Sequence, residues 1–281
     1  SILTNNPDHA QSIQSLKNIF LDNQKYEKGI DFFKTRLSQN PHDFRNYSEL
    51  GEFYYLNGQL KDANNIWYSG INKFKHSRSF YRIMISVFGK YGLNENISKT
   101  LDRGKNTFGK SFLSYEAGIY YQAHQVYDKA MEQYILHLIH EPNRNGIIER
   151  RILQMSDEDG ALDIIEKQLI LASKNDPIKT LNVLSEFYFK QQKYLLAIKA
   201  KEQWTTSGKR DFNDWLKFAN NLRKEGAYEF SIDAYEYILS YNLNSKITGK
   251  ALLGLAQTFE DQITPTNENH IIPYFFDQNI F

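Results

Sequence analysis

Residues 44–77 read FRNYSELGEFYYLNGQLKDANNIWYSGINKFKHS, and the pattern of this stretch recurs along the chain. Its marks are large apolar or small residues at fixed places, namely Tyr47, Leu50, Gly51, Tyr54, Gly58, Ala63, Trp67 and Gly70. The residues 34 positions further along the chain are Tyr81, Met84, Ile85, Phe88, Gly92, Ile97, Leu101 and Gly104. The residues 34 positions earlier include Ile13, Leu16, Phe20, Gly29 and Phe33. A fixed period of this size predicts a repeat protein.

Each repeat is expected to be a helical hairpin. Its first four marks fall at i, i+3, i+4 and i+7, which is one face of an α-helix, and its later marks form a second such face. A turn with Gly or polar residues, such as Leu56-Asn57-Gly58-Gln59, separates the two helices. Prolines at Pro41, Pro142 and Pro177 fall where the second helix should stop.

The series Tyr47-x2-Leu50-Gly51-x2-Tyr54…Ala63-x3-Trp67-x2-Gly70 resembles the signature of the tetratricopeptide repeat (TPR) family. The resemblance extends over about residues 10–262 and is weakest in residues 146–177. It implies an all-α, right-handed superhelical solenoid of antiparallel helical hairpins. In that family the first helices line a concave groove that holds an extended peptide or a partner helix.

The predicted domain organisation is an N-terminal flank (1–9), a solenoid (10–262) and an aromatic tail (263–281). The expected units are 10–43, 44–77, 78–110, 111–145, 146–177, 178–211 and 212–245, followed by a closing helix at 246–262. The tail is expected to cap the solenoid, to fold into its groove or to lead into a further domain. We favour a continuing chain, because the apolar residues of the closing helix span more than one face.

The residues expected to face the groove are those two, five, nine and twelve positions into each unit. The candidate partner-binding residues are Arg45, Ser48, Glu52, Tyr55, Arg82, Ser86, Tyr115, Gln122, Lys179, Asn182, Glu186, Phe189, Asn220 and Arg223. Aromatic and Arg side chains are typical of interface cores. The interpretation we favour is a non-catalytic scaffold that binds a peptide or a partner protein. Units two and three lack the Lys and Asn residues with which some family members bind a C-terminal carboxylate.

Composition narrows the alternatives. The chain has 281 residues and a formal net charge of +1, and this charge balance argues against a nucleic-acid partner. It has no Cys, which excludes disulfides and thiolate metal sites. No apolar run is long enough for a membrane span. Ser1 to His9 do not resemble a signal peptide, so the compartment stays open between cytoplasm and, if a signal peptide has been removed, periplasm. The many Asn, Tyr, Lys and Ile residues hint at a bacterial source, and oligomeric state is not predicted.

Two alternative functions remain. Basic residues outnumber acidic ones between Phe44 and Ser111, which is compatible with an RNA- or polyanion-binding helical repeat. The array is also compatible with the regulatory region of a larger enzyme or assembly.

Catalytic chemistry and cofactors are not expected. Gly104 to Ser111 match the P-loop pattern, but Gly104 occupies a small-residue position of a helix and no strand precedes it, so we interpret the match as coincidence. His137 and His140 lack further metal ligands. We therefore predict no enzyme activity, no metal site and no cofactor.

Overall fold

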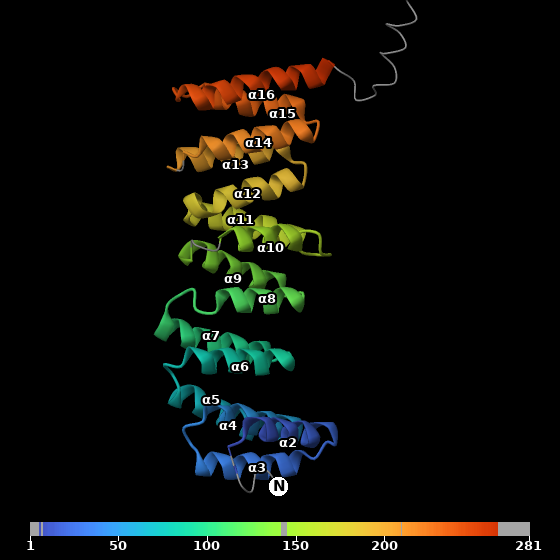
Figure 1. The fold of residues 1–281 in the computed structure, drawn as a ribbon, viewed down its shortest axis with the longest axis vertical. Coiled ribbons are helices and arrows are strands. Elements are labelled where there is room, and N and C mark those ends of the chain that lie inside the picture. Colours follow the sequence, from blue (N-terminus) through green and yellow to red (C-terminus); the bar gives the residue numbers. More distant parts are fainter. Residues whose placement is uncertain (1–5, 7, 142–144, 209, 264–281) are drawn as a thin grey trace, which may run out of the picture. The chain divides into compact units, whose positions relative to one another are not determined.

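The computed structural model describes residues 6, 8–141, 145–208 and 210–263, and within these residues all regular secondary structure is α-helical. The chain divides into two compact units, Ser1–His124 and Gln125–Phe281 (Figure 1). The N-terminal unit contains α2 (Ala10–Asp22), α3 (Tyr26–Gln39), α4 (Phe44–Leu56), α5 (Leu60–Lys73), α6 (Arg78–Lys90), α7 (Asn94–Phe108) and α8 (Ser114–Ala123). The C-terminal unit contains α9 (Tyr127–His140), α10 (Asn145–Met155), α11 (Leu162–Asn175), α12 (Pro177–Lys190), α13 (Tyr194–Thr206), α14 (Phe212–Lys224), α15 (Tyr228–Leu239) and α16 (Ser245–Ile263). The predicted all-α helical repeat is confirmed.

Every hairpin turn uses the same backbone device. Two residues before the second helix, the chain enters the left-handed region with a φ between 52° and 77°. The residues in this conformation are Gln24, Gly58, Gly92, Gln125, Gly160, Gln192 and Gly226. Glycine adopts this conformation without steric cost, whereas a side chain pays for it. The hairpin turns therefore share one backbone conformation, including the turns that have glutamine in place of glycine.

Side-chain caps distinguish the first helices of several hairpins from the second. Asp43, Ser77, Asp176 and Asp211 each accept a hydrogen bond from a backbone N–H in the first turn of α4, α6, α12 or α14. These bonds satisfy donors that a helix start leaves free. The second helices α3, α5, α7, α9, α11, α13 and α15 have no such cap and start from the left-handed turn instead.

Small residues allow the helices to approach closely within each unit. A Cβ built on Gly51 would lie 2.2 Å from Nε1 of Trp67, so α4 and α5 can pack this tightly only with glycine there. Trp67 is 1% exposed and donates from Nε1 to the Ser48 carbonyl at 3.2 Å. In the C-terminal unit Gly254 of α16 similarly makes room for the ring of Tyr235. The small positions of the repeat are thus contact points between helices.

The structure locates several residues that the sequence analysis singled out. Gly104 lies inside α7 and packs against the rings of Phe112 and Tyr81, so the P-loop-like stretch begins within a helix. Pro177 is the first residue of α12. Pro142 and residues 264–281 of the aromatic tail lie outside the described residues. Within the part of the chain that the structure describes, no helix is long and apolar enough to span a membrane.

Candidate partner-binding surfaces

The N-terminal unit has an open cavity of about 370 Å³ between the first helices α6 and α8. Its lining is predominantly apolar and includes Ile85, Leu113 and Tyr120. A Cβ on Gly89 would lie 3.0 Å from the Tyr120 ring, so this glycine lets the ring sit against α6. Leu113 has a φ of 55°, in the left-handed region, where it immediately precedes α8. The cavity is large enough for one or two bulky side chains.

Charged and polar groups surround this cavity. Arg82 Nε lies 3.3 Å from Glu116 Oε1, and both side chains are largely exposed. Tyr120 donates from its hydroxyl to Asn94 Oδ1 at 3.1 Å and stacks on His124 with ring centroids 4.2 Å apart. An exposed ion pair contributes little to stability, so Arg82 and Glu116 can exchange partners at low cost. The cavity therefore combines an apolar floor with a rim that is free to rearrange.

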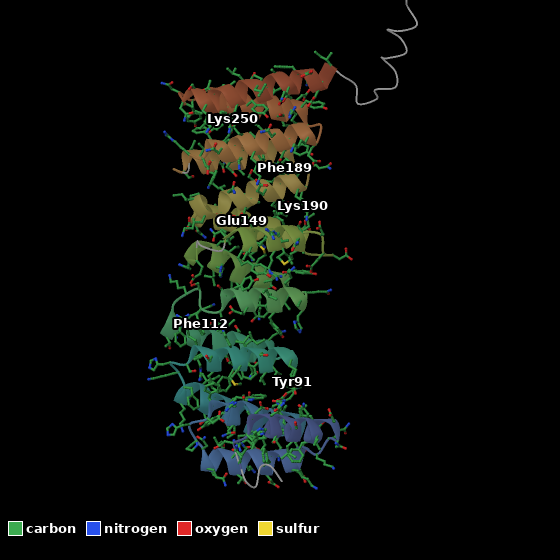
Figure 2. The ribbon with its side chains drawn as sticks, in the orientation of Figure 1. Tyr91, Phe112, Glu149, Phe189, Lys190 and Lys250 are labelled. Atoms are coloured by element: carbon green, nitrogen blue, oxygen red, sulfur yellow. The ribbon has the colours of Figure 1, made fainter. Side chains whose placement is uncertain are left out.

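A buried charge cluster links α2, α4 and the end of α6 in the same unit. Glu52 is 2% exposed and lies 2.7 Å from Lys17 Nζ and 2.8 Å from Lys90 Nζ. Tyr91, at the end of α6 (Figure 2), donates to Glu52 Oε1 at 2.5 Å, and Lys17 also contacts Glu49. Burial alone would raise the pKa of Glu52, but attraction to Lys17 and hydrogen bonds from Lys17, Lys90 and Tyr91 hold it below its ordinary value. This cluster fastens α2 to α4 and α6.

The C-terminal unit has a cavity of about 330 Å³ that combines aromatic and acidic side chains. We call it the acidic cavity, and its lining is Leu153, Glu186, Phe189, Lys190, Gln192, Tyr194 and Glu225. The rings of Phe189 and Tyr194 have centroids 5.7 Å apart. Lys190, beside Phe189 at the end of α12 (Figure 2), is neutralised by Asp157 at 2.7 Å.

A buried lysine lies behind the acidic cavity. Lys201 of α13 is fully buried, contacts Asp214 closely and donates to Asn182 Oδ1 at 2.9 Å. Glu186 Oε1 is 4.0 Å from the same ammonium group, so Asp214 is its main counter-ion. Burial, together with repulsion from Asp214, raises the pKa of Glu186 despite the attraction of Lys201. Burial and repulsion from Glu186 and Asp214 also raise the pKa of Glu149 on α10. Burial and the neighbouring carboxylates therefore disfavour ionisation of Glu149 and Glu186, despite the lysines nearby.

A second cavity of the C-terminal unit, of about 520 Å³, lies between the first helices α14 and α16. We call it the basic cavity, and its lining is Asn213, Leu216, Lys217, Asn220, Lys224, Lys250, Leu253, Gly254 and Gln257. Lys250 lies in the N-terminal part of α16 (Figure 2). Among the described residues, none of its three lysines forms an ion pair. The cavity is therefore basic, although Lys217 also attracts Glu149 and Glu186 of the acidic region.

Six of the residues predicted from the sequence line a cavity. Arg82 and Ser86 line the cavity between α6 and α8, Glu186 and Phe189 line the acidic cavity, and Asn220 lines the basic cavity. Arg45 lines a small cavity of about 60 Å³ between α2, α3 and α4 and pairs with Asp43 at 3.1 Å.

The other predicted residues are not part of these four cavities. Ser48 and Glu52 are buried and already have partners. Ser48 donates to the Arg45 carbonyl, and Glu52 belongs to the charge cluster. Tyr55 packs between Trp67 and Tyr91, and Arg223 pairs with Asp261 at 3.1 Å. Lys179 donates to the Ile139 carbonyl and Asn182 accepts from Lys201. Tyr115 and Gln122 of α8 are half-buried.

The sequence analysis missed the residues that set the charge of the C-terminal cavities. Lys224 and Glu225 follow Arg223, the last position predicted on α14, and Lys217 precedes Asn220, so none of the three was among the candidates. Lys250 is on the closing helix, for which no lining residue was predicted. Across the described residues, no group of three or more His, Asp or Glu side chains is arranged to hold a metal ion.

Comparison with known proteins finds similarity at the level of structure. No family model matches the sequence, and no curated protein matches it. The chain is similar to a tetratricopeptide repeat protein from Parabacteroides merdae ATCC 43184, with 14% identity over 89% of this chain and 98% of that one and a TM-score of 0.35. It is similar to the Cut9-Hcn1 hetero-tetramer of APC/C, with 13% identity over 92% of this chain and 50% of that one and a TM-score of 0.34. It is also similar to Pseudomonas aeruginosa pilF, with 10% identity over 78% of this chain and 97% of that one and a TM-score of 0.29.

The class of the protein follows from its own helices. Antiparallel hairpins recur with left-handed turns two residues before each second helix, and the small positions of the repeat are the contact points between helices. The chain is an all-α protein of repeated helical hairpins, and its repeat resembles the tetratricopeptide repeat in sequence.

Proposed function

We propose that the chain is a non-catalytic protein-interaction scaffold whose first helices bind an extended segment of a partner protein. The observation that carries the proposal is the cavity between α6 and α8, where an apolar floor is bordered by the exposed Arg82–Glu116 pair. Burial of a partner's apolar side chain there supplies free energy, and the rim charges orient the segment. Cavities between first helices of the C-terminal unit provide further contacts.

The proposal assigns different roles to the predicted groove residues. Arg82, Ser86, Glu186, Phe189 and Asn220 contact the bound segment directly, because they line the cavities. Glu52, Ser48 and Tyr55 support the surface from within the N-terminal unit, because their side chains are already engaged there. The remaining positions Arg45, Tyr115, Gln122, Lys179, Asn182 and Arg223 are proposed to flank the path of the segment.

Selection from a random peptide library displayed on phage tests the proposal without requiring a named partner. Ser86→Trp fills the cavity between α6 and α8, and Leu253→Trp fills the basic cavity; both residues are exposed. Ser69→Trp, at an exposed position of the second helix α5, is the matched control. We expect enriched peptides to lose at least tenfold in affinity for one of the two cavity variants and to bind the control as they bind the parent. Failure to enrich any peptide, or equal binding to all variants, would overturn the proposal.

A further inference from the structure

The two cavities of the C-terminal unit differ in charge, and their order defines the chemistry of what fits them. Building on the proposed scaffold function, we propose that this unit selects an extended protein segment with a basic side chain at one position and acidic side chains about three residues away. The basic side chain occupies the acidic cavity, and the acidic side chains occupy the basic cavity.

The acidic cavity is suited to a Lys or Arg side chain. Glu186 and Glu225 supply two carboxylates beside the rings of Phe189 and Tyr194, and a cation is attracted both by carboxylates and by aromatic faces. The cation that already lines the cavity, Lys190, is paired with Asp157. The nearest buried cation, Lys201, is closer to Asp214 than to Glu186. A partner's cation would therefore meet carboxylates with capacity left to bind it.

The basic cavity is suited to carboxylates. Lys217 and Lys224 approach it from α14 and Lys250 from α16, and the side chain of Gln257 adds an amide. Within the described residues none of these lysines forms a direct ion pair, although Lys217 attracts Glu149 and Glu186, so an incoming carboxylate need not displace a bound one. Three ammonium groups around about 520 Å³ can pair with two carboxylates at once.

The spacing of the charges follows from the helices. Lys224 lines the basic cavity and Glu225, the next residue, lines the acidic cavity, so the two cavities adjoin at the end of α14. Packed helices lie roughly 8–10 Å apart, and an extended chain advances roughly 3.3 Å per residue. A segment that crosses α14 therefore places its two charged positions about three residues apart.

The same charge order argues against a nucleic-acid segment. A nucleic-acid backbone carries negative charge at every nucleotide, and it would bring phosphates against Glu186 and Glu225 as well as against the lysines. A segment with both signs of charge is accommodated by both cavities.

Labelled peptides of identical composition test the inference by fluorescence anisotropy with the full chain. In the ordered peptide, one Gly and one Ser separate a single Arg from a pair of Asp residues. In the scrambled peptide, the Arg stands between the two Asp residues. Ordered peptides of both chain directions are measured. The double variant Lys224→Glu/Glu225→Lys exchanges two adjacent exposed charges and keeps the net charge, and its circular dichroism and melting temperature verify the fold.

We expect one ordered peptide to bind the parent at least tenfold more tightly than the scrambled peptide, and to lose at least tenfold in affinity for the double variant. Equal binding of ordered and scrambled peptides, or unchanged binding by the double variant, would overturn the inference. Stronger competition by a ten-nucleotide single-stranded RNA than by the ordered peptide would also overturn it. If one of these results overturns the inference while phage-selected peptides still distinguish Ser86→Trp or Leu253→Trp from the parent, the scaffold function stands.

Discussion

Lys224 and Glu225 are consecutive residues of opposite charge at the end of α14, and they line different cavities of the C-terminal unit. Successive residues of a helix point roughly 100° apart, so a charged pair at a helix end can serve two neighbouring surfaces. This arrangement gives the first-helix surface of the unit a sharp change of electrostatic sign. The following predictions concern that surface and the frame that supports it.

Adding a glycine to one hairpin turn and removing a glycine from another should change stability in opposite directions. Gln24 holds a left-handed φ of 52°, so Gln24→Gly should stabilise the chain by about 1 kcal/mol. Gly92 has a φ of 66° with nothing within 4 Å of a built Cβ, so Gly92→Gln should destabilise it by a similar amount through the backbone alone. Thermal unfolding followed by circular dichroism measures both. Melting temperatures that shift in the same direction would contradict this account of the turns.

Glycine at a helix contact should be irreplaceable, whereas glycine at an open helix position should not. Gly51→Ala forces Cβ into the Trp67 ring and should destabilise the chain by about 1–3 kcal/mol. Gly249→Ala, in α16 with nothing within 4 Å, should stabilise it slightly, because alanine favours the helix. Urea unfolding followed by Trp fluorescence distinguishes the two. Equal effects of the two substitutions would exclude the Trp67 contact as the cause.

Removal of the Glu52 charge should weaken the N-terminal unit. Glu52→Gln leaves Lys17 and Lys90 without their shared carboxylate and should destabilise the chain by about 2–3 kcal/mol at pH 7. The pKa of Glu52 is lowered in the folded chain, so its stabilisation is present above the unfolded pKa of about 4.3 and is lost as the pH falls through the folded value. The difference between parent and variant should therefore shrink below about pH 4. Urea unfolding across pH measures it, with Glu95→Gln, which removes an exposed pair with Lys99, as the control. A difference that is constant with pH would exclude the charge as its origin.

Binding of a basic side chain in the acidic cavity should weaken on acidification. The cavity binds a cation more tightly when Glu186 is ionised, and burial and repulsion from Asp214 raise the pKa of Glu186. Affinity for the ordered peptide should therefore begin to fall at a pH above the ordinary Glu value of about 4.3. Lys201 and Lys217 oppose this pKa shift and Glu225 adds a second carboxylate, so Glu186→Gln is needed as the comparison. The variant should bind more weakly at pH 7 and lose the upper part of the pH dependence, and an unchanged profile would contradict the assignment.

The sequence predicted the helical hairpins because their apolar and small positions repeat, and Gly51 and Trp67 show why each position is needed. It did not predict left-handed glutamines such as Gln24. The turns with glutamine adopt the same backbone conformation as the turns with glycine, so the residue type at this position does not reveal the conformation. Among the candidate site residues, Arg82 and Phe189 line cavities as their helical positions suggest. Glu52 is held in its buried position by Lys17 and Lys90, which reach it from the neighbouring repeats, and the periodicity of a single repeat does not encode such a long-range contact.

Hydrogen–deuterium exchange with a phage-selected peptide tests most directly whether the first helices bind a protein segment. Exchange is compared between the free and peptide-saturated chain by mass spectrometry. The account predicts slower exchange in first helices, either α6 and α8 or α12, α14 and α16, with α5, α7 and α15 unchanged. Protection confined to those second helices would contradict the proposed binding surface.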